Sequence, residues 1–533
     1  MSASVEPLSE AAGTATISAK LCYIAICIGI AIRVGFFFFA TNNGGDALAR
    51  AAVTADWISH PSLTLELGGP HWLPIHFWMM AALSIVVHSV TIGTRLLSLL
   101  FGAFSVWAVW RLARDQYGIH SALLSLVIFG LYTLHIGYST TSSSEVTYLG
   151  LILAALLCLF AYRRTGDLLV LGCAGILLTI SAGVRYEAWV FILLVGTLLV
   201  LKSSDGPFLS KQHAMSIVVF ACTAGIWPVF WMIVQWRLNG DALFGIHHNE
   251  GAIAGQLAIN PAHAGVYQLL LVPGVLLLTL TPLALIGAAY AVFLAVRRPL
   301  GRELAIIAVG FILIQFRTLA TGGILAGARY TLTDGVLISI LAGYGLYRIA
   351  QKFPLRSYHV LLGGTAIVMV ANLIVITTLS AEPNRLMDKF RSISPLLQYP
   401  QHIEEIARFL GPRLKASDAI VIDNYNEESN IIAAAIGLPL LRGNRAFLAS
   451  EADPRGVLGY MKEYQPQYVI MADLDDNLAP YLVLPSGCPN NVSIDGYEFS
   501  CIFQEKMYRL YAISYPMVRQ RVVASLTEIK NRN

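Results

Sequence analysis

Leu21–Ala40, LCYIAICIGIAIRVGFFFFA, is the first of a series of apolar segments that continues to Thr378. A helix of about 20 predominantly apolar residues is long enough to cross a bilayer. Only 13% of the 533 residues are charged, whereas a soluble protein carries about 25%. The sequence therefore predicts a multi-pass membrane protein surrounded by lipid. Leu21–Ala40 is expected to be an uncleaved signal anchor, because no small-residue cleavage site follows it.

Polar turns separate the apolar runs. The runs have the approximate bounds 21–40, 73–90, 93–110, 119–138, 146–162, 168–184, 188–201, 214–236, 266–295, 303–320, 334–350 and 358–379. After Ala381 the composition is mixed and polar, and no later run is long enough to cross. We expect a cytoplasmic segment at 1–20, a transmembrane domain at 21–380 and a separate domain at 381–533.

The distribution of Lys and Arg predicts the orientation, because cytoplasmic loops carry an excess of these residues. If 73–90 lies along the membrane surface, thirteen basic residues fall on the side of the N-terminus and six on the other side. If 73–90 crosses, twelve of the thirteen move to the outer side. The first arrangement predicts about eleven spans, with residues 41–92 and 381–533 outside. The thirteen are Lys20, Arg111, Arg114, Arg163, Arg164, Lys202, Lys211, Arg297, Arg298, Arg302, Arg348, Lys352 and Arg356.

The outward loop 41–92 is expected to hold two membrane-surface helices. In the first, Leu48, Ala51, Ala55 and Ile58 share one face at helical spacing, and Arg50, Thr54 and Asp56 point elsewhere. The second runs from Pro74 to Val90 and carries His76 and His88. Trp72 and Trp78 suit an interfacial depth, where an aromatic ring is half hydrated.

The C-terminal region alternates strand and helix patterns, which predicts a small α/β domain. Ala419–Asp423 and Tyr468–Met471 have the pattern of strands, and Phe499–Tyr515 that of two strands with a polar turn. Glu427–Ile436 and Asp453–Tyr464 have the pattern of helices. Cys488 and Cys501 lie in this region. Whether they form a disulfide is left open, since that requires an extracytoplasmic domain.

Composition and motifs exclude other classes of function. No clustered basic face indicates nucleic-acid binding. No Cys-x-x-Cys or other metal spacing occurs, and the adjacent His247 and His248 point in different directions on either a helix or a strand. We therefore predict no metal site, and a divalent metal is not favoured.

Two acids begin helical segments on the predicted outer side. Asp46 follows Thr41-Asn-Asn-Gly-Gly, and Glu145 follows Ser139-Thr-Thr-Ser-Ser-Ser. Asp caps helix N-termini well, so capping is one interpretation of each acid. The other is a general base at the lipid–water boundary that takes a proton from an acceptor hydroxyl.

Three further outward or buried polar groups are candidates for binding. Val184-Arg-Tyr-Glu-Ala-Trp189 places Arg185, Tyr186 and Glu187 in one turn, where Arg185 and Glu187 either pair with each other or form a polar site. Arg329-Tyr330 follows a run of small residues, and an Arg there offers bidentate donors to a phosphate. Arg33 lies inside the first span and either pairs in the interior or contacts phosphate.

These stretches together resemble the GT-C class of integral-membrane glycosyltransferases, in particular its bacterial protein-mannosyltransferase and aminoarabinose-transferase branch. The resemblance covers about 20–350. The stretches that carry it are Gly45-Asp46-Ala-Leu-Ala-Arg50, Gly69-Pro-His71-Trp-Leu-Pro-Ile-His76-Phe-Trp78, Thr94-Arg-Leu-Leu-Ser-Leu-Leu-Phe-Gly102, Arg111-Leu-Ala-Arg-Asp-Gln-Tyr-Gly118, Arg185-Tyr-Glu187 and Gly327-Ala-Arg-Tyr330.

The resemblance implies a polyprenyl-phosphate sugar donor bound from the outer side, an inverting reaction and a location in the cell's inner membrane. It assigns Asp46 to the catalytic acid of the first loop and Glu145 to the acid of the second. It places Arg329 near the lipid phosphate. His71 and His76, at the entry to the second surface helix, are expected to bind substrate. The chain departs from the family pattern at Ala47, at Gly68-Gly69 and at Glu145, so the donor sugar and the acceptor (protein, lipid or polysaccharide) are left open.

The chemistry agrees with these residues. A phosphate leaves already ionised, so it needs cationic stabilisation more than a proton donor. Arg329, with Arg185 or Arg33, supplies that charge, and a single displacement then needs only a base on the acceptor, which is the role expected for Asp46.

Two alternatives come from other classes of protein: a lipid or polysaccharide flippase or transporter, and an inactive scaffold whose C-terminal domain binds a partner. A transporter predicts ionisable residues in mid-span and often paired repeats. Here the ionisable residues gather at one set of span ends and no internal repeat is apparent. The glycosyltransferase is the preferred interpretation.

Overall fold

The structure is a computed structural model. The chain forms two compact units, Met1–Trp57 with Ser62–Gln398, and Ile58–Pro61 with Tyr399–Asn533. The described residues are 12–42, 46–62, 65, 67, 72–201, 210–259, 266–297, 300–324, 327–354, 356–381, 393–396, 401–414, 418–422, 432, 435–436, 446–448, 461–462, 465–472, 488, 491–494, 496–505 and 508–515.

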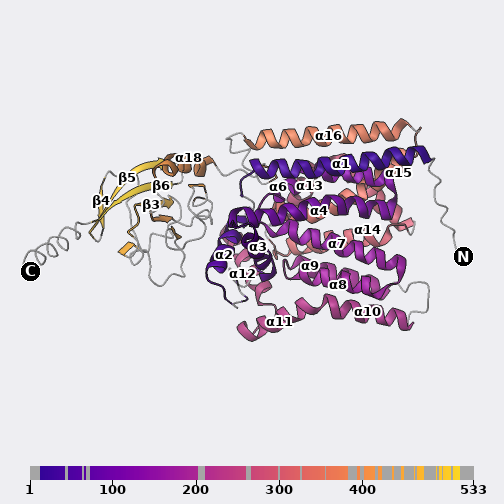
Figure 1. Cartoon of the computed structure of the whole chain (residues 1–533), viewed down its shortest axis with the longest axis horizontal. Coiled ribbons are helices and arrows are strands. Elements are labelled where there is room, and N and C mark those ends of the chain that lie inside the picture. The colour runs from indigo at the N-terminus through magenta and orange to yellow at the C-terminus, as the bar shows by residue number, and fades with distance from the viewer. Residues whose placement is uncertain are drawn as a thin grey trace, which may run out of the picture. The chain divides into compact units, whose positions relative to one another are not determined.

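The first unit is a bundle whose long helices run side by side, with the short helices α2, α3 and α12 gathered at one end (Figure 1). Its helices are α1 (Ala12–Phe39), α2 (Ala47–Ser59), α3 (Pro74–Val86), α4 (Val90–Tyr117), α5 (Ile119–Gly130), α6 (Thr133–Tyr138), α7 (Ser144–Thr165), α8 (Leu168–Ala182), α9 (Glu187–Leu201), α10 (Lys211–Ala224), α11 (Ile226–Asn239), α12 (Phe244–Ile259), α13 (Val266–Arg297), α14 (Arg302–Ala320), the 3-10 helix η2 (Ala328–Thr331), α15 (Leu332–Ala350) and α16 (Arg356–Ala381).

Among the described residues, six helices are long enough and apolar enough to cross a membrane. The number becomes seven if α10 and α11, which are bent by 47° at their junction, form one span. The apolar helices α3, α5, α8 and α9 are shorter than the roughly 20 residues that a perpendicular span needs. The predicted multi-pass membrane fold is confirmed, whereas the count of eleven spans stays a prediction.

Three predicted runs are interrupted. The run 214–236 divides into α10 and α11 at Gly225. The run 119–138 divides into α5 and α6 around Tyr132, whose buried hydroxyl donates to the carbonyl oxygen of Thr331 at 3.3 Å. In α13 the backbone leaves the helix at Thr281, with φ 71° and ψ 154°. Pro282 follows, and a proline disfavours helical backbone in the preceding residue. The second surface helix also ends at Val86 rather than Val90, and His88 has φ 54°.

The basic residues predicted to be cytoplasmic meet at shared helix ends. Arg163 at the end of α7 pairs with Glu303 at the start of α14, with an Nε–Oε2 distance of 3.1 Å. Arg164 pairs with Asp115 near the end of α4, also at 3.1 Å. The hydroxyl of Tyr117 donates to the carbonyl oxygen of Gly301 at 3.3 Å. These contacts place the ends of α4 and α7 and the start of α14 at one end of the bundle.

The second unit contains a six-stranded mixed sheet in the order β2-β1-β3-β6-β5-β4. β1 is parallel to β2 and β3, and the β3–β6, β5–β6 and β4–β5 pairs are antiparallel. Helix α18 (Gln401–Leu410), which is followed by the short 3-10 helix η3 (Gly411–Arg413), contributes buried Ile and Leu side chains to a core shared with β1. The strands are β1 (Ile420–Ile422), β2 (Ala446–Leu448), β3 (Tyr468–Ala472), β4 (Val492–Ile494), β5 (Tyr497–Glu505) and β6 (Tyr508–Ser514).

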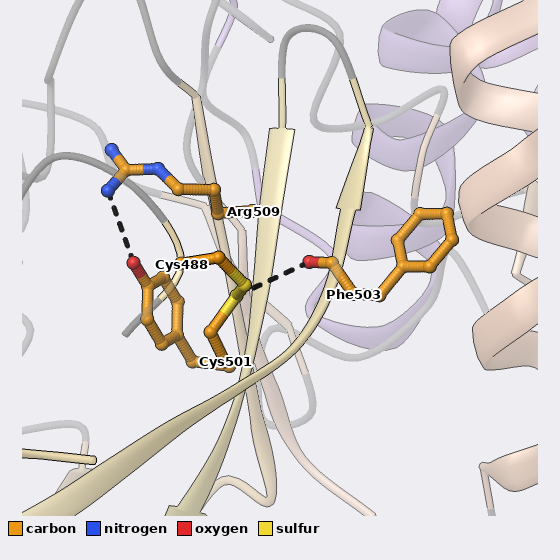
Figure 2. Close-up of a disulfide and its surroundings, with 5 residues drawn as sticks. Cys488, Cys501, Phe503 and Arg509 are labelled. Atoms are coloured by element: carbon orange, nitrogen blue, oxygen red, sulfur yellow. Dashed lines mark hydrogen bonds between the residues drawn. A yellow bond between two sulfur atoms is a disulfide. The ribbon is translucent and has the colours of Figure 1, made fainter. Parts of the chain in front are cut away.

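The strands predicted in the C-terminal region are present as β1, β3, β5 and β6. The predicted helices Glu427–Ile436 and Asp453–Tyr464 lie largely outside the described residues. Cys488 and Cys501 form a disulfide with a Cα–Cα distance of 5.3 Å. Figure 2 shows it beside β5, with Phe503 and Arg509 nearby. The bond links the segment before β4 to the middle of β5.

Small residues let α13 and α15 approach closely. A side chain at Gly345 of α15 would overlap the carbonyl oxygen of Gly287 in α13. We expect Gly345→Ala to destabilise the protein by about 1–3 kcal/mol, the usual cost of overpacking, measured as thermal unfolding in detergent. Gly363→Ala in α16 is the matched control, because its Cβ has nothing within 4 Å. Equal stability of the two variants would contradict the close approach.

Candidate active site

A cavity of about 320 Å³ lies in the first unit, at the end of the bundle that holds α2, α3 and α12. Its walls come from the first turns of α2, α7 and α9, from α12 and α14, and from η2 with the start of α15. The charged side chains among its described lining residues are Asp46, Arg50, Glu145, Arg185, Glu187, Glu250 and Arg329.

The structure brings together most of the predicted site residues. Those that line the cavity are Asp46, Glu145, Arg185, Tyr186, Glu187, Arg329 and Tyr330. They come from four segments that are far apart in the sequence. All four segments belong to the same compact unit, so the predicted residues meet at one cavity within it.

Asp46 lies directly before α2, with two arginines at its carboxylate. Its Oδ1 is 3.1 Å from Nη1 of Arg329, and its Oδ2 is 3.8 Å from Nη2 of Arg50. Burial opposes ionisation of Asp46, but the positive charges of Arg329 and Arg50 outweigh it and lower its pKa to about 2. The carboxylate is therefore ionised at any physiological pH.

Glu145 is in the first turn of α7, where a negative charge is favoured by the helix dipole. Its Oε1 is 2.8 Å from Nη1 of Arg185 and 3.9 Å from Nε of Arg329. Only 6% of the Glu145 side chain is exposed. Glu145 is therefore buried in the cavity wall, where it contacts both arginines. Asp46 is more exposed to the cavity.

The turn between α8 and α9 supplies Arg185, Tyr186 and Glu187. Arg185 pairs with Glu187 through its Nη2 at 2.5 Å, as one interpretation expected, and it also reaches Glu145. Burial disfavours the charged form of Arg185, but Glu187 and Glu145 raise its pKa above the usual arginine value. The hydroxyl of Tyr186 accepts a bond from Nε1 of Trp231 at 2.9 Å, which fixes its ring at the wall.

Arg329 and Tyr330 lie in η2. The Arg329 guanidinium is 5.1 Å from the centre of the Tyr330 ring, and that of Arg185 is 5.9 Å from the same ring. About a quarter of the Arg329 side chain (23%) is exposed, so its donors are accessible to a ligand. Both guanidinium groups therefore lie close to the Tyr330 ring, where cation–π attraction is favourable.

Two predicted binding residues of the described part of the chain, Arg33 and His76, do not line the cavity. Arg33 is fully buried and donates to the carbonyl oxygens of Gly29, Gly130 and Phe129 and to Nδ1 of His135. These bonds correspond to the interior pairing rather than to phosphate contact.

His76 does not line the cavity and is buried on α3 with Phe77 and Met80. Its two ring nitrogens have no hydrogen-bond partner among the described residues. His71 lies outside the described residues.

Two charged residues of the cavity, Arg50 and Glu250, were missed by the sequence analysis, and so was the aromatic Trp72. Arg50 and Thr54 were expected to point away from the buried face of the first surface helix, but α2 buries both. The reason is that Arg50 pairs with Asp46 and lies over the Trp72 ring, 4.7 Å from its centre. Its spacing of four residues from Asp46 was the available signal. Glu250 and Trp72 carried no comparable signal.

The described residues contain no group of three or more His, Cys, Asp or Glu side chains placed to hold a metal ion. His247 instead pairs with Asp241, with an Nδ1–Oδ2 distance of 2.6 Å. In the same helix, Asn249 and Glu250 face the cavity.

The chain resembles known membrane glycosyltransferases in part of its sequence and in its fold. The sequence model of the family described as dolichyl-phosphate-mannose-protein mannosyltransferase matches residues 68–231. Among solved structures, ArnT from Cupriavidus metallidurans bound to undecaprenyl phosphate has 14% identity and a TM-score of 0.58, covering 94% of this chain and 98% of that chain. The chain has the GT-C fold. The prediction of a membrane glycosyltransferase of the GT-C class is thereby confirmed at the level of class.

Two further structures agree with the GT-C assignment. The apo state of the same ArnT has 14% identity and a TM-score of 0.59, with 92% of this chain and 97% of that chain covered. The apo oligosaccharyltransferase of Archaeoglobus fulgidus has 12% identity and a TM-score of 0.50, with 87% and 70% covered. No curated protein sequence matches the chain significantly.

The two arginines at Asp46 predict how its pKa responds to substitution. In Arg329→Gln we expect the pKa of Asp46 to rise from about 2, because one of two compensating charges is lost while burial remains. Infrared difference spectra across a pH titration measure this through the carboxyl band that Asp46→Asn removes. Arg329→Lys, which keeps the charge, should give a smaller rise. An unchanged titration in Arg329→Gln would show that the pair does not control Asp46.

Proposed function

We propose that this GT-C enzyme transfers a sugar from a polyprenyl-phosphate-linked donor to an acceptor on the extracytoplasmic side of the membrane. The reaction is an inverting displacement with Asp46 as the general base. The observation that carries this proposal is the convergence of Asp46, Glu145 and Arg329 on one cavity. The fold shared with ArnT bound to undecaprenyl phosphate supports a lipid-linked donor.

The arginines are the proposed phosphate site. Arg329 is partly exposed to the cavity, and Arg50 is buried at its wall with an Nη1 that has no hydrogen-bond partner among the described residues. When the bond between the sugar and the phosphate oxygen breaks, the lipid phosphate leaves as an anion, which guanidinium donors stabilise in a site that excludes water. Arg185, held by Glu145 and Glu187, adds a further positive charge to the cavity wall.

Asp46 is the proposed base because its carboxylate is ionised and borders the same cavity. A carboxylate with so low a pKa is a weak base while both arginines hold it. A donor phosphate that takes hydrogen bonds from Arg329 competes with Asp46 for that guanidinium. The competition would raise the basicity of Asp46 when the donor is in place, as general-base catalysis requires.

Glu145 is proposed to act beside Asp46 as the second acid of the site. Its carboxylate bridges Arg185 and Arg329 from within the wall. It would hold both guanidinium groups against the donor while Asp46 faces the acceptor. Tyr186, Glu187 and Tyr330 complete the walls around the transferred sugar.

The orientation is proposed from charge and from the disulfide. The loops rich in Lys and Arg would be cytoplasmic, which leaves the cavity on the outer face of the inner membrane. The Cys488–Cys501 disulfide supports an extracytoplasmic second unit, because disulfides persist in oxidising compartments. On this view residues 1–20 are cytoplasmic, 21–380 form the transmembrane domain and 381–533 lie outside.

Asp46→Asn should reduce sugar transfer by about 100-fold or more, within the range for loss of a general base. Binding of undecaprenyl phosphate to the purified protein should not weaken, because the substitution removes a negative charge beside the phosphate site. Turnover with a panel of undecaprenyl-phosphate sugars and a lipid-binding titration measure the two effects. Asp56→Asn, at an exposed position of the same helix, is the matched control. Full turnover in Asp46→Asn would exclude it as the base.

Arg329→Ala should show the opposite pattern, with undecaprenyl phosphate affinity reduced at least tenfold, because a charged hydrogen-bond partner is lost.

A flippase would instead keep lipid movement in Asp46→Asn and produce no new glycosidic bond. Mass spectrometry of surface glycans after deletion of the gene identifies the acceptor. An unchanged set of glycans would count against a transferase.

A further inference from the structure

The two acids of the cavity follow buried segments that are not helical. Asn42, four residues before Asp46, is 5% exposed, and Ser139–Ser143, just before Glu145, is almost fully buried. Buried backbone groups outside regular structure need partners, and leaving them unpaired is costly. These two segments bond in part to each other and to helix α4.

Asn42 binds Ser142 through both ends of its side-chain amide. Its Oδ1 accepts a bond from the backbone N–H of Ser142 at 2.7 Å, and its Nδ2 donates to Oγ of Ser142 at 2.9 Å. An amide paired at both its donor and its acceptor holds the partner in one orientation and at one distance. The segment after α1 is therefore joined directly to the segment before α7.

Helix α4 binds the segment before α7 through polar side chains. Oγ of Ser142 donates to Oγ1 of Thr94 at 2.7 Å, and Oγ of Ser98 donates to the carbonyl oxygen of Ser143 at 3.1 Å. We name Asn42, Thr94, Arg95, Ser98 and Ser142 the loop clamp.

Arg95 is the member of the clamp that reaches both segments. Its Nε donates to the carbonyl oxygen of Thr140 at 2.6 Å. Its Nη2 donates to the carbonyl oxygens of Phe37 at 2.6 Å and of Ala40 at 2.9 Å. One guanidinium thus ties the end of α1 to the segment before α7.

We infer that Asn42 is a positioning residue, which through the loop clamp sets the placement of Asp46 against Glu145. Asp46 follows Asn42 by four residues and Glu145 follows Ser142 by three. Arg329 contacts both acids, at 3.1 Å and 3.9 Å. A shift of either segment changes both distances together. The inference rests on the proposed function for its catalytic consequence, whereas the coupling of the two segments is a property of the fold.

Hydrogen exchange of the full-length protein in detergent tests the coupling without any assay of activity. In Asn42→Ala, amide exchange should become faster in peptides that contain Ser142 as well as in those that contain Asn42. Ser142→Ala keeps the backbone N–H that binds Oδ1, so it should give a smaller increase. Ser105→Ala is the control, since this buried α4 hydroxyl binds the Phe101 carbonyl oxygen within its own helix. Faster exchange in Asn42 peptides alone would overturn the inference.

Turnover and lipid binding test the catalytic consequence. Asn42→Ala should lower turnover by about 10- to 100-fold, as misplacement by an ångström can do. Binding of undecaprenyl phosphate should stay within about threefold, as Arg329 is retained. Ser142→Ala should lose less, and Ser105→Ala nothing. Equal loss of binding and turnover, or wild-type turnover in Asn42→Ala, would overturn the positioning role. If the wild-type protein neither binds the lipid nor transfers sugar, the proposed function fails and hydrogen exchange alone decides the coupling.

Discussion

The ion pair between Asp46 and Arg329 is the interaction on which the cavity depends. It joins the segment after the first apolar helix to the 3-10 helix before α15. These two segments are far apart in the sequence. Because Arg329 also lies near Glu145, and Glu145 binds Arg185, four distant segments meet through one chain of opposite charges. Without that chain the acids would repel each other in a poorly hydrated site, and the arginines would be buried without compensation.

The same requirement explains the polar groups deeper in the bundle. Arg33 lies inside α1 and is satisfied by backbone carbonyl oxygens and by His135. The buried Ser139–Ser143 segment is satisfied by Asn42 and by α4. In a membrane domain such polar groups have no water to bond, so they bond within the protein. This divides the charged residues into those that support the fold and those that face the cavity.

Much of the fold could be predicted because its signals are local. Apolar runs of spanning length marked α1, α4, α7, α13, α14 and α16, and alternating or continuous apolar residues marked β1, β3, β5 and β6. The breaks at Tyr132, Gly225 and Thr281 were not predicted, since hydropathy continues across them although the regular helix does not. For the site, the acids and arginines at span ends were found by charge, while Glu250 and Trp72 entered through tertiary packing alone.

The sequence by itself determined that the chain is a membrane protein with a small α/β domain, and which polar residues gather at one set of helix ends. These properties follow from composition and periodicity, which act over a few turns of chain. Only the tertiary structure decided that Arg50 lies over the Trp72 ring, that Arg33 bonds to backbone carbonyl oxygens in the interior, and that Asn42 binds Ser142. A side chain's partner depends on which helices pack together, and no pattern within a single segment contains that information.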